Sequence, residues 1–516
     1  MKYLLKTFFV CIIILALNKI EVKGFNLMDY ISTRSSRETA ERISAAEAVI
    51  RGLAPDGGLY IPVEIPCFGV EKIAEMDYTE LAFQIMSLYF DDYTDEELRI
   101  CVEGAYDEGF DDELRAPLKQ VGDIHFLELF HGKTLAFKDM ALSILPRLMT
   151  AAAKKTGLDK EIVILTATSG DTGGAALAGF AGVEGIKAIV FYPQGGVSEI
   201  QRLQMVSREE NNVFVSAVIG NFDDAQRAVK KIFSDKDFAK ELSEKGVILS
   251  SANSINIGRF IPQIVYYYYA YAQLIKNNEI KIGEKIDFVV PTGNFGNILA
   301  GYYAYKMGLP IGRLICASNI NNVLYDFFNE GIYDANREFV LTSAPAMDIL
   351  VSSNLERLIY DLSGRDGVAI KACMDKLSSD GKYEFKEKCG IVESEFATEA
   401  ECFAAIKKMF EQNYLMDTHT AVAVAALEKV GKSEHKTVIT STASPYKFGV
   451  DVYKAVSGVE LEESLALKEL EKASGVEIPE AIASLSKKSI VHGGVIEISE
   501  MQDFVVRAIG KGCKNC

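Results

Sequence analysis

The sequence predicts an α/β fold in which helices cover both faces of parallel β-sheets, with a mostly helical segment ahead of them. From about residue 160 onward, short β-branched runs alternate with helical stretches. The runs are apolar almost throughout, which is typical of parallel strands buried on both faces. The chain has 516 residues, a length that predicts two or three domains.

Two segments precede the alternating part of the chain. An apolar run at residues 7–17 is too short to span a bilayer but suits a signal peptide. Because no small-residue cleavage site follows, residues 1–27 are either an export or anchor segment or the product of a misassigned start, with translation beginning at Met28. We favour the second interpretation. Residues 28–118 combine helical patterns with acidic clusters, so we expect a separate, mostly helical N-terminal domain.

The α/β core is expected over residues 119–455, where the strand and helix patterns lie. Its predicted strands cover residues 161–167, 187–192, 212–219, 247–250, 286–290, 314–317 and 436–440. Its predicted helices cover residues 223–240, 257–276 and 297–307. Residues 378–396 interrupt the alternation and are expected to form a surface insertion, and residues 456–516 are expected to form a charged helical region. Ligands bind at the carboxyl ends of the strands in such sheets, so the loops after the strands are the candidate sites.

Composition argues against several classes of function. The chain has 55 Lys and Arg against 72 Asp and Glu, and its net charge of −17 disfavours binding to nucleic acids or anionic membranes. Its nine cysteines are sparse, as in reduced cytoplasmic proteins, and only Cys513 and Cys516 lie close together. That pair has the spacing of half a zinc site, but no second pair matches it, and there are only five histidines. We therefore expect no metal site.

A lysine lies in an apolar stretch of the segment LFHGKTLAFKDM. Lys138 has Ala136, Phe137, Met140 and Ala141 as neighbours. A lysine in an apolar pocket has a lowered pKa and becomes a nucleophilic amine that can form a Schiff base. On this segment alone, a surface lysine at the start of a helix is the better interpretation.

Two glycine-rich loops each follow a predicted strand and precede a predicted helix. TATSGDTGG offers the hydroxyls of Ser169 and Thr172 at a helix N-terminus, where an anion is stabilised. PTGNFGN contains Gly293 and Gly296, which let the backbone approach a phosphate closely. The second loop is neither a P-loop nor a dinucleotide-binding motif. Each loop is a candidate phosphate site or a plain tight turn.

Polar residues follow two further strands. SANSINIGR combines neutral amides, a hydroxyl and one guanidinium, from Asn253 to Arg259, and this set suits a small doubly charged anion. In TSTASPYKF, at residues 440–448, a hydroxyl could face a ring nitrogen or cap the following helix. His131 and His419 lie near these segments, but a lone histidine is more often a structural hydrogen-bonding residue than a catalytic one.

Together these segments resemble the threonine synthase family, whose members are fold-type II pyridoxal-phosphate enzymes. The resemblance lies in FHGKTLAFKDMA, TATSGDTGGAA, ANSINIGRFIPQIVYYYYAY and PTGNFGNILAGYYAYKMGLP, and in MDYISTRS followed by GLAPDGGLYIP. It runs in order from Met28 to about Val450. It implies two parallel-sheet α/β domains with the cofactor in the cleft between them, and residues 119–455 as the pyridoxal-phosphate-dependent catalytic core.

The resemblance also implies roles for individual residues. Lys138 would form the Schiff base with pyridoxal 5'-phosphate, and Thr442 would bond its pyridine nitrogen. Asp171 would lie beside the ring hydroxyl, where it would have to be protonated or turned away from a phenolate. The cofactor phosphate would be held by Gly293, Asn294, Phe295, Gly296 and Asn297. The substrate phosphate would be bound by Lys133, Ser169, Thr172, Asn253 and Arg259. Lys133 departs from the proline expected at its position.

The activity implied by the resemblance is that of a carbon–oxygen lyase acting on phosphate. O-phospho-L-homoserine and water would give L-threonine and phosphate, the last step of threonine biosynthesis, with Lys138 moving the protons. We expect a cytoplasmic monomer or homodimer that binds no nucleic acid. We also expect it to bind no membrane unless residues 1–27 are an anchor. Two alternatives stay open: a threonine/serine dehydratase or related lyase on the same fold, and an exported or anchored phosphate-binding protein without catalysis.

Overall fold

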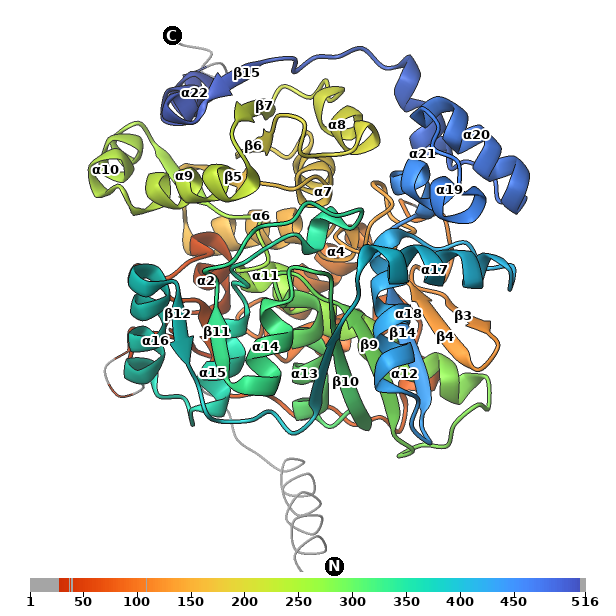
Figure 1. The fold of residues 1–516 in the computed structure, drawn as a ribbon. Coiled ribbons are helices and arrows are strands. Elements are labelled where there is room, and N and C mark those ends of the chain that lie inside the picture. The colour runs from red at the N-terminus through yellow and green to blue at the C-terminus, as the bar shows by residue number, and fades with distance from the viewer. Residues whose placement is uncertain (1–26, 37, 39, 108, 511–516) are drawn as a thin grey trace, which may run out of the picture.

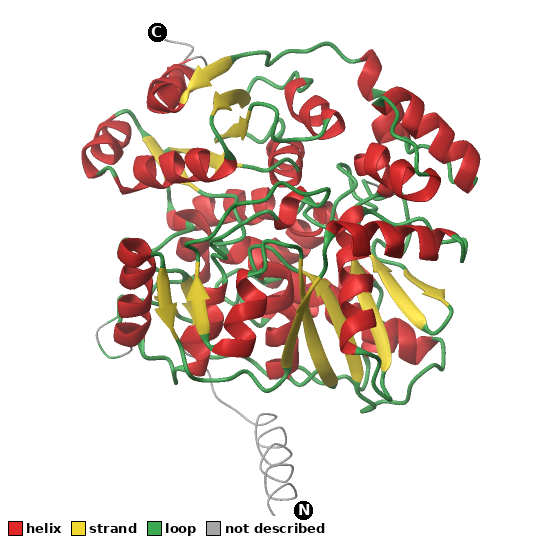
Figure 2. Ribbon diagram, viewed as in Figure 1, coloured by secondary structure: helices red, strands yellow, loops and turns green. Residues whose placement is uncertain are grey.

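The computed structural model describes residues 27–510 except for residues 37, 39 and 108. Two β-sheets with helices around them dominate the described part (Figures 1 and 2). Among these residues, no helix is both long enough and apolar enough to cross a membrane. The predictions for residues 1–26 and for the terminal cysteine pair fall outside the described residues.

The larger sheet has six strands in the order β13-β10-β9-β14-β4-β3, and only β3 runs antiparallel to its neighbour. Its strands are β3 (Leu118–Val121), β4 (Ile124–Glu128), β9 (Ile286–Pro291), β10 (Ile311–Ser318), β13 (Val392–Phe396) and β14 (Lys436–Ser441). Ile439 of the central strand β14 lies opposite Phe126 on one side and Val289 on the other. Helices cover both faces: α12 and α13 on one, and α17 and α18 on the other.

The smaller sheet has five strands in the order β15-β7-β6-β5-β8, all of them parallel. Its strands are β5 (Glu161–Ala167), β6 (Ile186–Pro193), β7 (Val213–Ile219), β8 (Val247–Ser250) and β15 (Val495–Glu497). One face packs on α9, α10 and α22, and the other on α6, α7 and α8. The predicted α/β fold, with helices on both faces of parallel sheets, is therefore confirmed.

Most of the remaining chain is helical. The helices that flank the two sheets are α5 (Asp139–Leu142), α6 (Leu145–Thr156), α7 (Asp171–Phe180), α8 (Glu199–Val206), α9 (Phe222–Ser234), α10 (Lys236–Glu244), α11 (Ile257–Phe260), α12 (Pro262–Lys276), α13 (Gly296–Met307), α14 (Val323–Glu330), α17 (Glu399–Phe410) and α18 (Thr418–Val430). Further along lie α15 (Leu355–Leu362), α16 (Gly367–Asp380), α19 (Gly449–Ser457), α20 (Glu463–Ser474), α21 (Glu480–Ala483) and α22 (Met501–Gly510).

The N-terminal segment packs directly onto the α/β part. It contains α2 (Ala45–Arg51), α3 (Tyr78–Ser87), α4 (Asp95–Ala105) and a small antiparallel pair, β1 (Tyr30–Ser32) and β2 (Tyr60–Pro62). Helix α3 lies on α12, where the rings of Tyr78 and Tyr269 meet edge to face at 5.1 Å. One continuous hydrophobic core includes both parts of the chain. The domain boundaries stay a prediction.

Several predicted elements differ from the structure. The predicted helix at 223–240 is interrupted at Asp235, whose carboxylate accepts backbone hydrogen bonds and caps α10. The predicted helix at 257–276 is interrupted before Pro262, which begins α12. Residues 378–396 lie mostly at the surface, but they are not without regular structure: β13 adds an edge strand to the larger sheet, and β12 (Lys382–Glu384) pairs with β11 (Ile332–Asp334).

Candidate functional site

A cavity of about 1550 Å³ lies where strand ends of both sheets converge. The loops after β5 and β8 of the smaller sheet line it, as do the loops after β9 and β14 of the larger sheet. This is the edge at which parallel sheets bind ligands. The predicted site residues that line the cavity are Lys138, Ser169, Asp171, Thr172, Asn253, Arg259, Gly293, Asn294, Phe295, Gly296, Asn297 and Thr442.

Lys133 is the predicted site residue that does not line the cavity. Its side chain is exposed and lies against Gly109, where an added Cβ would be 2.8 Å from Cε of Lys133. The solvated interpretation of this lysine therefore fits the structure better than a role in binding phosphate within the cavity.

Lys138 lies immediately before α5, at the wall of the cavity. The preceding residue is tied to the loop after β14, because the backbone N–H of Phe137 donates to the carbonyl of Thr442 at 2.8 Å. Burial lowers the pKa of the Lys138 amine to about 8; the carboxylate of Asp171 opposes this shift, while Arg259 and Lys447 add to it. Roughly a tenth of this amine is therefore neutral and nucleophilic at pH 7, far more than of an ordinary lysine.

The loop from Gly293 to Asn297 leads into the N-terminus of α13. Phe295 has a positive φ of 63°, and a Cβ on Gly293 would lie 2.6 Å from the carbonyl oxygen of Ala346. The loop therefore requires glycine where it passes Ala346. Two buried amide atoms, Oδ1 of Asn294 and Nδ2 of Asn297, have no hydrogen-bond partner in the described chain. Free backbone N–H groups and an unpaired amide donor at the start of a 12-residue helix suit a phosphate.

Two tyrosines orient the side chain of Asn297. The hydroxyls of Tyr266 and Tyr267 lie 2.8 and 2.7 Å from its Oδ1, and both tyrosines are fully buried in α12. Because the amide oxygen is occupied by these donors, Nδ2 is the amide atom left for a ligand. The sequence did not indicate this contact.

A second group of unpaired polar atoms surrounds Arg259. This residue is 2% exposed, and its Nη1 donates to the carbonyl of Ala252 at 2.8 Å. Its Nε and the Oδ1 of nearby Asn253 have no hydrogen-bond partner within the described residues. Burial lowers the pKa of Arg259 to about 10, and no carboxylate of the described chain forms a salt bridge with it. A buried guanidinium without a counter-ion suits an anionic ligand.

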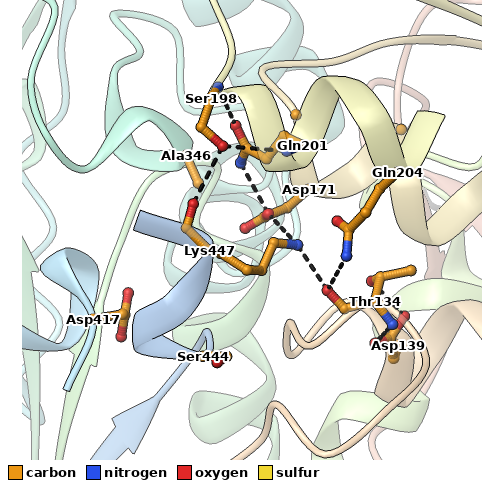
Figure 3. Close-up of polar contacts among 12 residues, drawn as sticks. Thr134, Asp139, Asp171, Ser198, Gln201, Gln204, Ala346, Asp417, Ser444 and Lys447 are labelled. Carbon is orange, nitrogen blue, oxygen red and sulfur yellow. Dashed lines mark hydrogen bonds and ion pairs between the residues drawn. The ribbon is translucent and has the colours of Figure 1, made fainter. Parts of the chain in front are cut away.

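Asp171 forms a buried ion pair that the sequence did not indicate. Its Oδ1 lies 2.8 Å from Nζ of Lys447 and accepts a hydrogen bond from Nε2 of Gln201 at 2.9 Å (Figure 3). Burial alone would raise the pKa of the Asp171 carboxyl, but the charges of Lys447 and Lys138 hold it well below the usual range. Asp171 is thus ionised. In the segment TSTASPYKF, the sequence pattern indicates the hydroxyls and not Lys447.

Two residues complete the wall of the cavity. Thr442 follows β14, and its side chain is available at the strand end. His419 lies at the start of α18, where its Nδ1 is 2.8 Å from Oδ2 of Asp417 and its Nε2 accepts from the backbone N–H of Ala346. Both ring nitrogens of His419 are therefore occupied, which agrees with its predicted structural role.

The chemistry of this cavity follows from three features. One neutral amine, that of Lys138, can attack a carbonyl carbon or accept a proton. The Gly293–Asn297 loop can hold one phosphate, and Arg259 with Asn253 can hold a second anion. The cavity can therefore bind a phosphate-bearing carbonyl compound together with a separate anionic ligand.

Known proteins are similar to this chain in both sequence and fold. A model for the threonine synthase N terminus matches residues 29–106, and one for pyridoxal-phosphate dependent enzymes matches residues 113–442. The threonine synthase of Saccharomyces cerevisiae is 38% identical over 489 residues, covering 86% of this chain and 93% of that protein. Threonine synthase-like 1 of Pongo abelii is 38% identical over 462 residues, but the match covers only 62% of that protein's length.

A solved structure supports the same relationship. The crystal structure of a PLP-bound threonine synthase from Brucella melitensis superposes with a TM-score of 0.81 and 35% sequence identity. The match covers 93% of this chain and 99% of the Brucella chain. Both the N-terminal segment and the α/β part are therefore included in the shared fold.

Proposed function

The chain belongs to the threonine synthase family of pyridoxal-phosphate-dependent enzymes, and we propose that it converts O-phospho-L-homoserine and water into L-threonine and phosphate. One observation carries the proposal. The low-pKa amine of Lys138 shares its cavity with two separate anion sites, the Gly293–Asn297 loop and the Arg259 group. A cofactor phosphate and a substrate phosphate require two such sites at once.

The residues present fit pyridoxal phosphate. Lys138 would bind its carbonyl carbon, and the loop from Gly293 to Asn297 would hold its phosphate, with the unpaired Nδ2 of Asn297 as one donor. Thr442 offers the neutral hydroxyl that a pyridine nitrogen can bond. When bound, the cofactor withdraws electrons from the α-carbon of an amino acid and makes its proton acidic.

The protein's own residues supply binding and proton transfer. Once a substrate amine has displaced it, the amine of Lys138 is free to take the proton from the α-carbon and later to return one, because its pKa lies near neutral pH. The guanidinium of Arg259 and the amide of Asn253 would hold the substrate phosphate and stabilise its charge as it leaves.

A dehydratase on the same fold is the alternative within this class of enzyme. Such an enzyme acts on an unphosphorylated hydroxy amino acid and has no need for a buried guanidinium. The absence of a carboxylate salt bridge to Arg259 among the described residues favours the phosphorylated substrate. The cytoplasmic location and the monomeric or homodimeric state stay predictions.

Substrate comparison tests the proposed function. The full chain with pyridoxal phosphate is incubated with O-phosphohomoserine, homoserine, threonine or serine, and threonine, phosphate and 2-oxo acids are quantified. We expect threonine and phosphate from O-phosphohomoserine and little product from the others. Lys138→Ala should abolish this turnover, whereas Lys133→Ala should preserve it because Lys133 lies outside the cavity. A 2-oxo acid from threonine or serine as the main product would favour the dehydratase.

A further inference from the structure

Lys447 is a fully buried lysine that takes no part in the proposed chemistry. It lies in the 3₁₀ helix Pro445–Phe448 after β14, with 0% of its side chain exposed. Its Nζ lies 2.8 Å from Oδ1 of Asp171 and donates to the carbonyl of Thr134 at 2.8 Å (Figure 3). Fully buried ion pairs stabilise a fold poorly, because both charges lose their hydration. The pair therefore needs an explanation other than stability.

The contacts of Lys447 form a closed ring between elements of the two sheets. Its carbonyl accepts from Oγ of Ser198, which caps α8 and bonds the backbone of Gln201. Gln201 in turn donates to Asp171 at the start of α7. Lys447 thus fixes Asp171 through the ammonium group directly and through Ser198 and Gln201 indirectly, as Figure 3 shows. This ring leaves little freedom for the Asp171 carboxylate to turn.

The charged groups around the Lys138 amine determine how readily this amine loses its proton. The charged groups that act on Lys138 are Asp171 on α7, Arg259 on α11 and Lys447. The charged groups that act on Asp171 are Lys447 and Lys138, and the neutral ring of His419 on α18 lies near it. Without Lys447, the Asp171 carboxylate would pair with Lys138 and retain the proton that must leave its amine.

Asp139 is the other buried carboxylate next to this ring. Its two oxygens accept from the backbone N–H and the hydroxyl of Thr134, both at 2.8 Å. It is therefore bonded by neutral donors, and the ammonium of Lys447 is paired with Asp171 and not with Asp139.

We propose that Lys447 is a positioning residue that neutralises and anchors Asp171, so that this carboxylate does not hold Lys138 in its protonated, unreactive form. The proposal rests on the proposed function only in taking Lys138 as the reactive amine. According to this proposal, Lys447 affects the protonation of Lys138. A residue that only stabilised the conformation of a loop would not have this effect.

The test measures the pH midpoint of the visible absorption of the cofactor bound to the full-length protein, without substrate. This midpoint reports the loss of the proton from the Lys138 nitrogen that is joined to the cofactor. Lys447→Met keeps the length of the side chain and removes its charge. We expect its midpoint to rise by about one to three pH units, which is the size of pKa shift that an opposite charge within a few ångströms produces. Lys454→Met is the matched control, because Lys454 is a surface lysine on α19 paired with Glu460. Its midpoint should equal that of the wild type.

A double variant separates charge from structure. Lys447→Met with Asp171→Asn removes both charges, so we expect a midpoint within about half a pH unit of the wild type. A Lys447→Met midpoint that does not move would overturn the proposal. If Lys447→Met fails to fold or to bind cofactor, Lys447→Gln is measured in its place, because it removes the charge but keeps a hydrogen-bond donor for Asp171; the same rise is expected, and an unchanged midpoint contradicts the proposal. A wild type without a visible cofactor band would count against the proposed function instead.

Discussion

Tyr266 and Tyr267, which contact Asn297 of the Gly293–Asn297 loop, should control the affinity of the protein for pyridoxal phosphate. Tyr266→Phe and Tyr267→Phe each remove one hydroxyl from Oδ1 of Asn297, at 2.8 and 2.7 Å respectively. A neutral hydrogen bond contributes about 0.5–1.5 kcal/mol, so each single change should weaken cofactor binding by up to roughly tenfold. The double change leaves the amide free to rotate and should weaken binding by up to roughly a hundredfold.

The assay is a titration of the cofactor-free protein with pyridoxal phosphate, with urea unfolding measured separately to detect any loss of stability. Tyr303→Phe is the matched control, because Tyr303 is buried on α13 and its hydroxyl has no partner among the described residues. If the double variant bound the cofactor as tightly as Tyr303→Phe, Asn297 would not depend on these tyrosines, and its assigned orientation would be wrong.

Three further predictions concern the same cavity. Arg259→Lys should lower kcat/KM for O-phosphohomoserine by roughly tenfold to a hundredfold, since a charged hydrogen bond contributes about 1.5–3 kcal/mol, while cofactor affinity stays unchanged. Weaker cofactor binding in the titration with unchanged kinetics would show that the two phosphate sites are assigned the wrong way round. Gly293→Ala should weaken cofactor binding by roughly 5- to 150-fold, from about 1–3 kcal/mol of overpacking against Ala346, whereas Gly390→Ala, which meets no atom within 4 Å, should have no effect in the same titration. In the cofactor-free protein, acylation of Lys138 should increase with pH around a midpoint of about 8, because only the deprotonated amine reacts; a midpoint near that of an ordinary lysine, read by mass spectrometry, would contradict the buried setting.

Seven of the eleven strands in the two sheets could be predicted because they are apolar runs, whereas β3, β4, β13 and β15 were not predicted. The predicted strand at 247–250 coincides with β8, and that at 161–167 with β5. β13 could not be predicted in this way, since VESEF is polar on alternate residues and occupies the edge of the sheet. The interruption at Asp235 was also unexpected, because the helical periodicity continues across it while a side-chain cap separates the two helices.

Site residues that lie just after a strand could be predicted from the sequence. Contacts between side chains from distant parts of the chain could not. Asn297 and Arg259 lie at the starts of α13 and α11, shortly after β9 and β8, and the structure brings both to one cavity. The pairing of Asp171 with Lys447 links residues 276 positions apart in the chain, and no local pattern reports such a contact. Lys133, the cation found where the resemblance leads one to expect a proline, lies outside the cavity.

Isotopically labelled water tests the central claim most directly. If the enzyme expels the phosphate by cleaving a carbon–oxygen bond and adds water at the β-carbon, threonine formed from O-phosphohomoserine should carry the labelled oxygen in its hydroxyl group, and the released phosphate should carry none. Mass spectrometry of both products reads the result. Labelled phosphate, with homoserine in place of threonine, would reveal hydrolysis of the phosphate ester and would contradict the account of Lys138 and Arg259 given above.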